Sequence, residues 1–307
     1  MKNIVLKSAL GGALIFACCA VSAKAPEPKS FNVWPEGKMP GTAAAAETMK
    51  GTHITAVAVP ELKLYRANSD KPSGLVIICP GGGYTLLAYD HEGEQVARWL
   101  NDNKISAAIL KYRVPANPDG ALQDIQRAVR LARANAKDWN ISPDKIAVLG
   151  FSAGANLCAR ASAPCEGKTY ESADSADEFS ARPNLTCLVY PAYCDNPGNE
   201  KRWNKTAPDK DADYNALYAL ASNLKIDKDT PPVFIIQSQN DRSYVNGAIA
   251  YFLAMKRAGV PSQLHIFDSG GHGYGLADGR DHINDLCREW PQLAANWFKH
   301  YKFSTED

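Results

Sequence analysis

The sequence has no excess of charge of either sign, because 34 lysines and arginines stand against 33 aspartates and glutamates among its 307 residues. A formal net charge of +1 offers no field to attract a nucleic acid or an anionic membrane, so neither is expected as a partner. The chain also lacks the C-x-x-C and H-x-x-x-H spacings of common metal sites. We therefore expect a protein without a metal or other cofactor. The length of the chain lies within the usual span of one large α/β domain, and no internal repeat is visible.

The apolar run near the start of the chain, Ala9–Val21, is too short to span a bilayer stably. It follows a start that carries two lysines and precedes an A-x-A pattern at Ala23–Ala25. These features are typical of a secretory signal peptide, here residues 1–25, with a buried N-terminal helix as the alternative. We expect export to the periplasm or the exterior, with no transmembrane segment in the mature chain. Residues 15–18 also resemble a bacterial lipoprotein site, in which Cys18 would carry a lipid anchor.

Two of the eight cysteines lie inside the predicted signal peptide, and export would permit disulfides among the others. Three lie within apolar strand or helix patterns and are expected to be buried free thiols: Cys79, Cys158 and Cys187. Three lie in less regular stretches, where disulfide pairing is open: Cys165, Cys194 and Cys287.

Residues 26–52 are rich in proline, alanine and glycine and predict an extended lead-in, with Trp34 docking on the body of the protein. Residues 53–307 then form the expected catalytic domain. Its first two stretches, 53–59 and 61–66, alternate apolar and polar residues on either side of a proline. This pattern predicts an antiparallel pair at the edge of a sheet.

From residue 75 onward, short apolar runs alternate with amphipathic stretches. The expected strands cover residues 75–79, 105–111, 145–149, 185–190, 233–237 and 264–267. The expected helices cover residues 93–101, 122–139, 153–161, 247–258 and 283–301. The alternation predicts an α/β fold with a mostly parallel central sheet flanked by helices on both faces, and ligands bind beyond the carboxyl ends of such strands. The polar segments 162–184 and 195–225 either cap that edge or form surface loops.

Gly150-Phe-Ser152-Ala-Gly154 follows one of these apolar runs and precedes a stretch of small residues. This order is that of a nucleophile elbow, in which a strand ends, a sharp turn holds a serine between two glycines, and a helix begins. The turn lifts the serine hydroxyl clear of the sheet. The pentapeptide alone is a weak signal, and its position between a strand and a helix makes Ser152 the candidate nucleophile.

A serine hydroxyl needs a base, and the base needs an acid that fixes its tautomer. His272 follows the last expected strand in a glycine-rich loop, at the same edge as the elbow, and is the candidate base. The other downstream histidines lie on a strand or beside the last helix: His265, His282 and His300. Asp241 follows the strand at 233–237 and is the candidate acid, with Asp268 as its competitor, because the chain order in this fold class is Ser, acid, His.

The oxyanion of an ester intermediate needs backbone N–H donors. The amide of Ala153 is one candidate, and Gly82 and Gly83, in a triplet directly after an apolar strand, are the others. Tyr84, His91 and Glu92 follow this triplet and are weaker candidates for substrate binding. The alternative is a packing role for Tyr84 and a helix-start pairing for His91 and Glu92.

Seven stretches carry a resemblance to a known family: residues 33–37, 79–84, 90–93, 110–113, 124–128, 150–154 and 270–274. They resemble the acetylxylan-esterase-like and feruloyl-esterase-like carbohydrate esterases of the α/β-hydrolase superfamily, relatives of the hormone-sensitive-lipase type. The resemblance runs over residues 31–300 and implies the α/β-hydrolase fold with Ser152, Asp241 and His272 as its triad. The chain departs from the family at Pro80, where many relatives have histidine, and at Ala155-Asn156, where Gly-His is usual.

Together these features predict an exported serine esterase that removes acetyl or similar small acyl groups from plant-derived polysaccharide or oligosaccharide. A feruloyl esterase or a general carboxylesterase is the alternative within the same chemistry, and a peptidase is disfavoured because peptidases usually add a large substrate-sieving domain. A non-catalytic carbohydrate-binding relative is disfavoured because such proteins usually lose a member of the triad.

Overall fold

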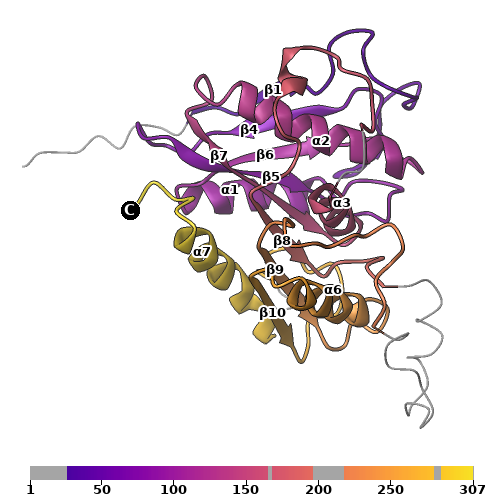
Figure 1. Cartoon of the computed structure of the whole chain (residues 1–307), viewed down its shortest axis with the longest axis vertical. Helices are drawn as coiled ribbons and strands as arrows, with labels where there is room; N and C mark the ends of the chain where they lie inside the picture. Colours follow the sequence, from indigo (N-terminus) through magenta and orange to yellow (C-terminus); the bar gives the residue numbers. More distant parts are fainter. Residues whose placement is uncertain (1–25, 165–167, 196–217, 280–284, 307) are drawn as a thin grey trace, which may run out of the picture.

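The computed structural model describes residues 26–164, 168–195, 218–279 and 285–306. Its eight-stranded sheet has the order β1-β4-β6-β5-β7-β8-β9-β10, and β2 and β3 form a separate two-stranded sheet (Figure 1). The strands are β1 (Lys29–Asn32), β2 (Thr48–Lys50), β3 (His53–Ala56), β4 (Glu61–Tyr65), β5 (Ser73–Cys79), β6 (Ser106–Lys111), β7 (Ile141–Phe151), β8 (Leu185–Val189), β9 (Val233–Ser238) and β10 (Ser262–Phe267). The helices are the π-helix η1 (Asp90–Glu94), α1 (Gln95–Asp102), α2 (Pro118–Ala134), α3 (Ala153–Ser162), the 3-10 helix η2 (Ser175–Glu178), α6 (Val245–Arg257), the 3-10 helix η4 (Leu286–Glu289) and α7 (Trp290–His300).

The six strands from β6 to β10 run parallel, and only β1 and β4 at one edge are antiparallel to their neighbours. Strands such as β5 and β8 are buried along their whole length, which explains why they occur as continuous apolar runs in the sequence. The predicted mostly parallel sheet is therefore confirmed, and so are the positions of its strands from residue 75 onward.

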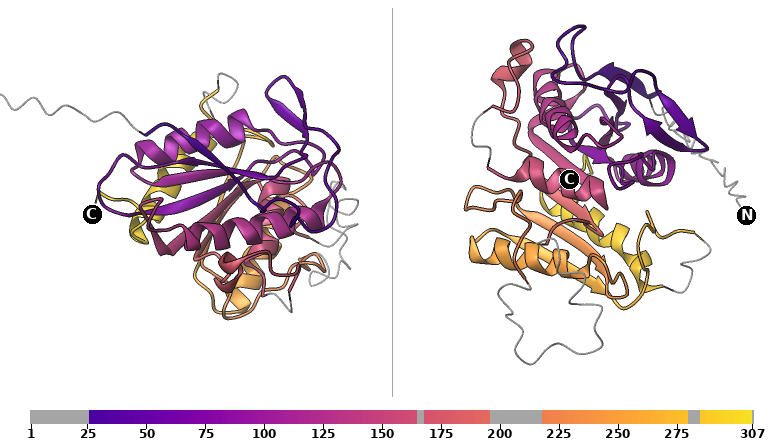
Figure 2. Two further views of the ribbon diagram at one scale, coloured as in Figure 1. Left: turned by 90° about the horizontal axis from the view of Figure 1, so that it is seen from above. Right: turned by 90° about the vertical axis from the view of Figure 1, so that its right-hand side faces the viewer.

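Helices cover both faces of this sheet, as the two views of Figure 2 show. Buried side chains of α2, α3 and α6 pack on one face in one apolar cluster, and those of α1 and α7 pack on the other face in a second cluster. The start of α2 follows from local chemistry, because the Asn117 side chain accepts a hydrogen bond from the Gly120 amide and Pro118 occupies the first turn.

The predicted antiparallel pair between residues 53–59 and 61–66 is wrong. β3 pairs with β2, whereas β4 lies in the main sheet between β1 and β6. The residues between β3 and β4 bond to distant loops instead of forming a tight turn, since the Val57 amide donates to the Val114 carbonyl and the Pro60 carbonyl accepts from Val33. Residues 26–52, expected as an extended lead-in, contribute both β1 and β2.

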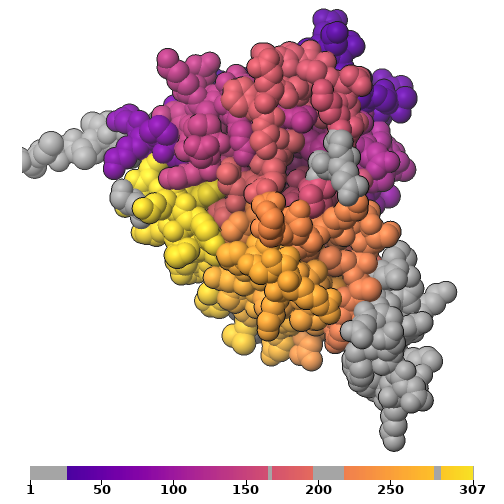
Figure 3. Space-filling model, viewed as in Figure 1, coloured from indigo at the N-terminus to yellow at the C-terminus, as the bar shows by residue number. Residues whose placement is uncertain are grey.

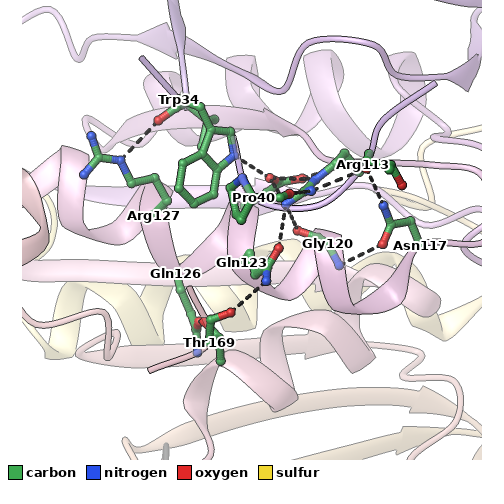
Figure 4. A network of polar contacts seen from close by, with 12 residues as sticks. Trp34, Pro40, Arg113, Asn117, Gly120, Gln123, Gln126, Arg127 and Thr169 are labelled. Atoms are coloured by element: carbon green, nitrogen blue, oxygen red, sulfur yellow. Dashed lines mark hydrogen bonds and ion pairs between the residues drawn. The ribbon is translucent and has the colours of Figure 1, made fainter. Parts of the chain in front are cut away.

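A buried ion pair attaches this N-terminal segment to the core (Figure 4). Arg113 pairs with Asp124 on α2 at 2.9 Å, and both side chains are 1% exposed or less. The indole N–H of Trp34 donates to the same carboxylate at 2.7 Å, and the Arg113 guanidinium also donates to the Pro40 carbonyl. Burial raises the pKa of Asp124, while the hydrogen bonds from Arg113 and Trp34 favour its charged form. The expected docking of Trp34 on the body is confirmed.

The described part of segment 162–184 runs along α2 and lies on the molecular surface shown in Figure 3. Arg127 pairs with Asp177 at 2.9 Å, Arg130 donates to the Tyr170 hydroxyl at 2.5 Å, and Arg133 donates to the Ser180 carbonyl at 2.5 Å. These contacts extend toward the C-terminal end of α2, which leads into the start of β7. The segment thus braces α2 instead of capping the carboxyl edge of the sheet. Most of segment 195–225 lies outside the described residues.

The brace predicts a pH-dependent contribution to stability. Burial alone would raise the pKa of Asp177, but hydrogen bonds from the Ala173 amide, Tyr170 and Arg127 outweigh it and hold that pKa below its usual value. The stabilisation is therefore complete above the ordinary aspartate pKa of about 3.9 and is lost as the pH falls through the lower folded value. Asp177→Asn should lower the free energy of unfolding by about 1 kcal/mol at pH 7, and by less at pH 3.

Urea unfolding at the two pH values checks this expectation, with the exposed neighbour Glu178→Gln as the control variant that should change little at either pH. A destabilisation by Asp177→Asn that is equally large at both pH values would show that the carboxylate charge is not involved.

Five cysteines are free and buried in the described ranges. Cys79, Cys158 and Cys187 agree with the prediction of buried thiols, and Cys194 and Cys287, for which the sequence leaves disulfide pairing open, are free and buried as well. Burial raises the pKa of Cys158 and of Cys187, so neither is a reactive thiolate at neutral pH. Cys165 and Cys18 lie outside the described residues.

None of the helices in the described ranges combines the length and the apolarity that crossing a membrane requires. The predicted signal peptide, residues 1–25, lies outside those ranges.

Candidate active site

Ser152 lies at the sharp turn between β7 and α3. Its backbone φ of 52° is rare for a residue with a side chain, and this turn raises the hydroxyl above the sheet. There is no room for a side chain at either of the two flanking glycines. A Cβ on Gly150 would lie 2.2 Å from the Gly154 carbonyl oxygen, and one on Gly154 would lie 2.1 Å from the Cys79 carbonyl oxygen. The local structure is therefore a nucleophile elbow.

The structure brings Ser152, His272 and Asp241 together in one hydrogen-bonded row. His272 Nε2 is 2.8 Å from Ser152 Oγ, and His272 Nδ1 is 2.7 Å from Asp241 Oδ2. Asp241 is buried in the loop after β9, and His272 follows β10 with its side chain 32% exposed. Because the carboxyl ends of these parallel strands meet at one edge of the sheet, three distant stretches of sequence converge there.

The competing residues lie elsewhere. The Asp268 carboxylate accepts a hydrogen bond from its neighbour Ser269, and the His265 ring packs against Phe234 on the sheet surface. His300 lies at the end of α7, beside the ring of Tyr301. His282 lies outside the described residues.

Asn240 makes a contact between two loops of the site that the sequence did not indicate. Its side-chain oxygen accepts a hydrogen bond from the Gly271 amide at 2.8 Å, which ties the loop of Asp241 to the loop of His272. An asparagine next to an acid in a loop has many ordinary roles, so no pattern in the chain marks this one. The bond holds Asp241 and His272 in register, because it joins the residues immediately before each of them.

Three candidate donor amides are oriented by the carbonyl groups of their own peptide units. The amides belong to Gly82, Gly83 and Ala153, and none of them donates to a protein acceptor in the described part of the chain. In each of these peptide units, the carbonyl of the preceding residue accepts at least one backbone hydrogen bond of 2.9–3.2 Å. These carbonyls belong to Gly81, Gly82 and Ser152. Such bonds fix the direction of the N–H groups and polarise them, as stabilisation of an oxyanion requires.

The glycine loop itself lies directly against the elbow. A Cβ on Gly81 would lie 2.9 Å from Ser152 Cβ, and one on Gly82 would lie 2.2 Å from the Leu86 carbonyl oxygen. Gly82 also has a φ of 130°, which side chains rarely adopt. Larger residues are therefore excluded at Gly81 by space, and at Gly82 by both space and backbone conformation.

Tyr84 lies in an aromatic row at this edge. Its ring is 6.4 Å from that of Tyr193 at an interplanar angle of 24°, Tyr193 contacts Tyr244, and Tyr244 contacts the His272 ring at 4.9 Å. Asn156, where relatives have histidine, accepts from the Tyr84 hydroxyl at 2.9 Å and donates to the Tyr193 carbonyl at 3.0 Å. This departure therefore holds the aromatic row in place. Tyr193 is 42% exposed.

His91 and Glu92 differ sharply in their surroundings. The His91 side chain is 39% exposed and packs beside Gly275 in the loop that follows His272. Glu92 is 3% exposed and accepts hydrogen bonds from the Gly81 amide and from the Tyr190 hydroxyl, each at 2.7 Å. Burial raises the pKa of Glu92, whereas these two hydrogen bonds favour its ionised form.

Within residues 26–164, 168–195, 218–279 and 285–306, no group of three or more histidine, cysteine, aspartate or glutamate side chains is arranged to hold a metal ion.

Comparison with known proteins places the chain in a family. The BD-FAE family model matches residues 62–250, a range that includes Ser152 and Asp241. An acetylxylan esterase of Xylanibacter ruminicola is 30% identical over 251 residues, which cover 78% of this chain and 48% of that protein. The chain thus spans about half the length of this curated relative.

Solved structures agree with that placement. An acetyl ester-xyloside bifunctional hydrolase from Caldicellulosiruptor lactoaceticus superposes with a TM-score of 0.71 at 31% identity, covering 92% of this chain and 100% of that one. The carboxylesterase Cest-2923 from Lactobacillus plantarum shares the fold, with a TM-score of 0.64 at 22% identity over 87% of this chain and 100% of its own. The chain belongs to the BD-FAE family and has the α/β-hydrolase fold, as its resemblance to acetylxylan-esterase-like proteins predicts.

Proposed function

We propose that the protein is an exported serine esterase that removes acetyl or similar small acyl groups from plant-derived carbohydrate. The observation that carries the proposal is the hydrogen-bonded row from Ser152 through His272 to Asp241, beside three amides without protein acceptors in the described chain. This combination is what acyl transfer needs: a nucleophile, a base in the correct tautomer, and donors for the oxyanion.

In the proposed reaction, Ser152 Oγ attacks the ester carbonyl carbon while His272 Nε2 takes the hydroxyl proton. The amides of Gly82, Gly83 and Ala153 stabilise the negative oxygen of the tetrahedral intermediate, and the N-terminus of α3 adds its positive dipole end. The intermediate collapses as the C–O bond to the sugar breaks and His272 returns its proton to the leaving hydroxyl.

The acyl-enzyme is then hydrolysed by the same groups. His272 takes a proton from water as the water oxygen attacks the acyl carbon. The second intermediate then collapses as its bond to Ser152 Oγ breaks, His272 returns the proton to Oγ, and the acid is released. Asp241 holds the imidazole through Nδ1 in both halves of the cycle. The proposed chemistry uses no metal and no organic cofactor.

The substrate class rests on the names of the relatives. One acts on acetylxylan and another on acetyl esters and xylosides, according to their descriptions. The exposed Tyr193 and its neighbour Tyr84 supply flat apolar surface of the kind that sugar rings contact, so the proposed sugar position lies over this aromatic row.

Export is part of the proposal because insoluble plant polysaccharide does not enter cells. It is supported by the short apolar run Ala9–Val21 and the A-x-A pattern at Ala23–Ala25. A lipid on Cys18 is the alternative form of the exported protein, and metabolic labelling with a palmitate analogue distinguishes the two.

The test is acetate release from acetylated xylo-oligosaccharides, measured in parallel with ferulate release from feruloylated arabino-oligosaccharide, with the Ser152→Ala protein as the blank. We expect fast acetate release that the blank lacks. Ferulate release without acetate release would retain the mechanism and change the substrate class to feruloyl esters. If wild type releases neither product and hydrolyses no small ester, the proposed function is wrong.

A further inference from the structure

The buried carboxylate of Glu92 links the glycine loop before Tyr84 to the loop that follows His272. Among the described residues, no backbone hydrogen bond joins these two loops directly. Its Oε2 accepts from the Gly81 amide at 2.7 Å, and its Oε1 accepts from the Tyr190 hydroxyl at 2.7 Å. The Tyr190 hydroxyl oxygen in turn accepts from the Gly275 amide at 2.9 Å. Gly81 precedes the proposed oxyanion donors, and Gly275 lies three residues after His272.

The direction of every bond in this chain is determined by chemistry. An amide N–H can only donate, so Tyr190 must accept from Gly275 and direct its own proton to Glu92. Glu92 therefore receives a donor on each oxygen, which is the arrangement of an ionised carboxylate and cannot be reproduced by a neutral amide. His91 Nε2 lies 3.7 Å from the same carboxylate.

The packing around these bonds leaves little freedom. A Cβ on Gly81 would lie 2.7 Å from Glu92 Oε2 and 2.9 Å from Ser152 Cβ, so the carboxylate, the glycine loop and the elbow are in close contact. The Tyr190 ring lies edge-on to the His272 ring, with centroids 5.0 Å apart. A shift of Glu92 would therefore be transmitted to the oxyanion donors on one side and to the base on the other.

We propose that Glu92 is a positioning residue that, through Tyr190, sets the distance between the oxyanion loop and the histidine loop. The inference rests on the proposed function, because it assigns Glu92 a role in that same reaction. Its role is to hold Gly82 and Gly83 where the oxyanion forms while His272 stays in reach of Ser152. Glu92 itself touches no reacting atom.

Glu92→Gln tests the proposal with a nearly isosteric change. The amide of glutamine can accept only one of the two hydrogen bonds, so one link of the chain breaks. We expect kcat for p-nitrophenyl acetate to fall about 10²-fold, the size of effect that a misplacement of about 1 Å produces, while KM changes less than about threefold. Inhibition by a boronic acid, whose serine adduct places an oxygen at the oxyanion position, should weaken by a similar factor.

Tyr190→Phe removes the same link with a smaller change and guards against misfolding of the first variant. It should lower kcat about tenfold, and the double variant should be no slower than the slower single one because both break one chain. Glu94→Gln is the matched control. Glu94 lies two residues from Glu92 and pairs with Lys63 and Arg98 on the surface, so its replacement should leave kcat unchanged.

All rates are taken per active site, titrated with a fluorophosphonate. An active wild type whose kcat and boronate affinity survive both Glu92→Gln and Tyr190→Phe would overturn the positioning role and leave the proposed function intact. A wild type that reacts with neither the ester nor the fluorophosphonate would overturn the proposed function and this inference with it.

Discussion

Replacing Ser152 by alanine is expected to lower kcat for ester hydrolysis by about 10⁶-fold, the order seen when a serine hydrolase loses its nucleophile. Without Oγ no acyl-enzyme can form, and His272 is left beside a methyl group. The amides of Gly82, Gly83 and Ala153 remain, so a small residual rate above that of water should persist through stabilisation of the oxyanion. The measurement is kcat for p-nitrophenyl acetate, together with labelling by a fluorophosphonate, which the variant should lose completely.

Ser269→Ala is the control for this prediction. Ser269 lies three residues before His272 and bonds to Asp268 and Asp285, outside the hydrogen-bonded row. Its loss should change kcat less than about threefold and leave the labelling intact. If Ser152→Ala keeps more than about 1% of the wild-type rate, the nucleophile is a different residue.

Replacing Asp241 by asparagine is expected to lower kcat by about 10³- to 10⁴-fold with little loss of stability. The aspartate holds the His272 proton on Nδ1, so Nε2 is free to accept the proton of Ser152. An asparagine can present its N–H₂ group to Nδ1 and favour the opposite tautomer, in which Nε2 carries a proton and cannot act as a base.

Asp268→Asn is the matched variant, because Asp268 is the other carboxylate near His272 in the sequence. The Asp268 carboxylate accepts a hydrogen bond from Ser269. Within the described residues, the carboxylate that contacts His272 Nδ1, at 2.7 Å, is that of Asp241. We expect Asp268→Asn to retain kcat within about threefold. The reverse order of sensitivity, with Asp268→Asn inactive and Asp241→Asn active, would show that the loops rearrange around the substrate.

The sequence predicted the parallel core because each buried strand is a continuous apolar run between turn residues. It also marked Ser152, because the tight turn between a strand and a helix leaves no room for a side chain at the flanking positions, which are therefore Gly150 and Gly154. The edge of the sheet was less predictable. Residues 53–66 have a pattern that suits any half-buried strand, and the choice of partner depends on contacts from Val33 and Val114, which lie far away in the chain.

Polar residues that act through others were the hardest to identify. The sequence offers Glu92 only as a residue of the pocket mouth or of a helix start, whereas it is buried and bonded to its distant partners Gly81 and Tyr190. Asn240 is unremarkable in a loop until its bond to Gly271 is seen. Such residues have no periodic or spacing signal, because their partners come from other strands.

The order in which the strands join has a consequence for when activity arises. The elbow and the proposed donor amides are complete once residues up to β8 have folded, whereas the acid follows β9 and the base follows β10 at the edge of the sheet. A chain folded only through β8 thus holds a serine that nothing can deprotonate. With the proposed mechanism, the first appearance of ester hydrolysis in refolding would time the docking of the last two strands rather than the collapse of the core.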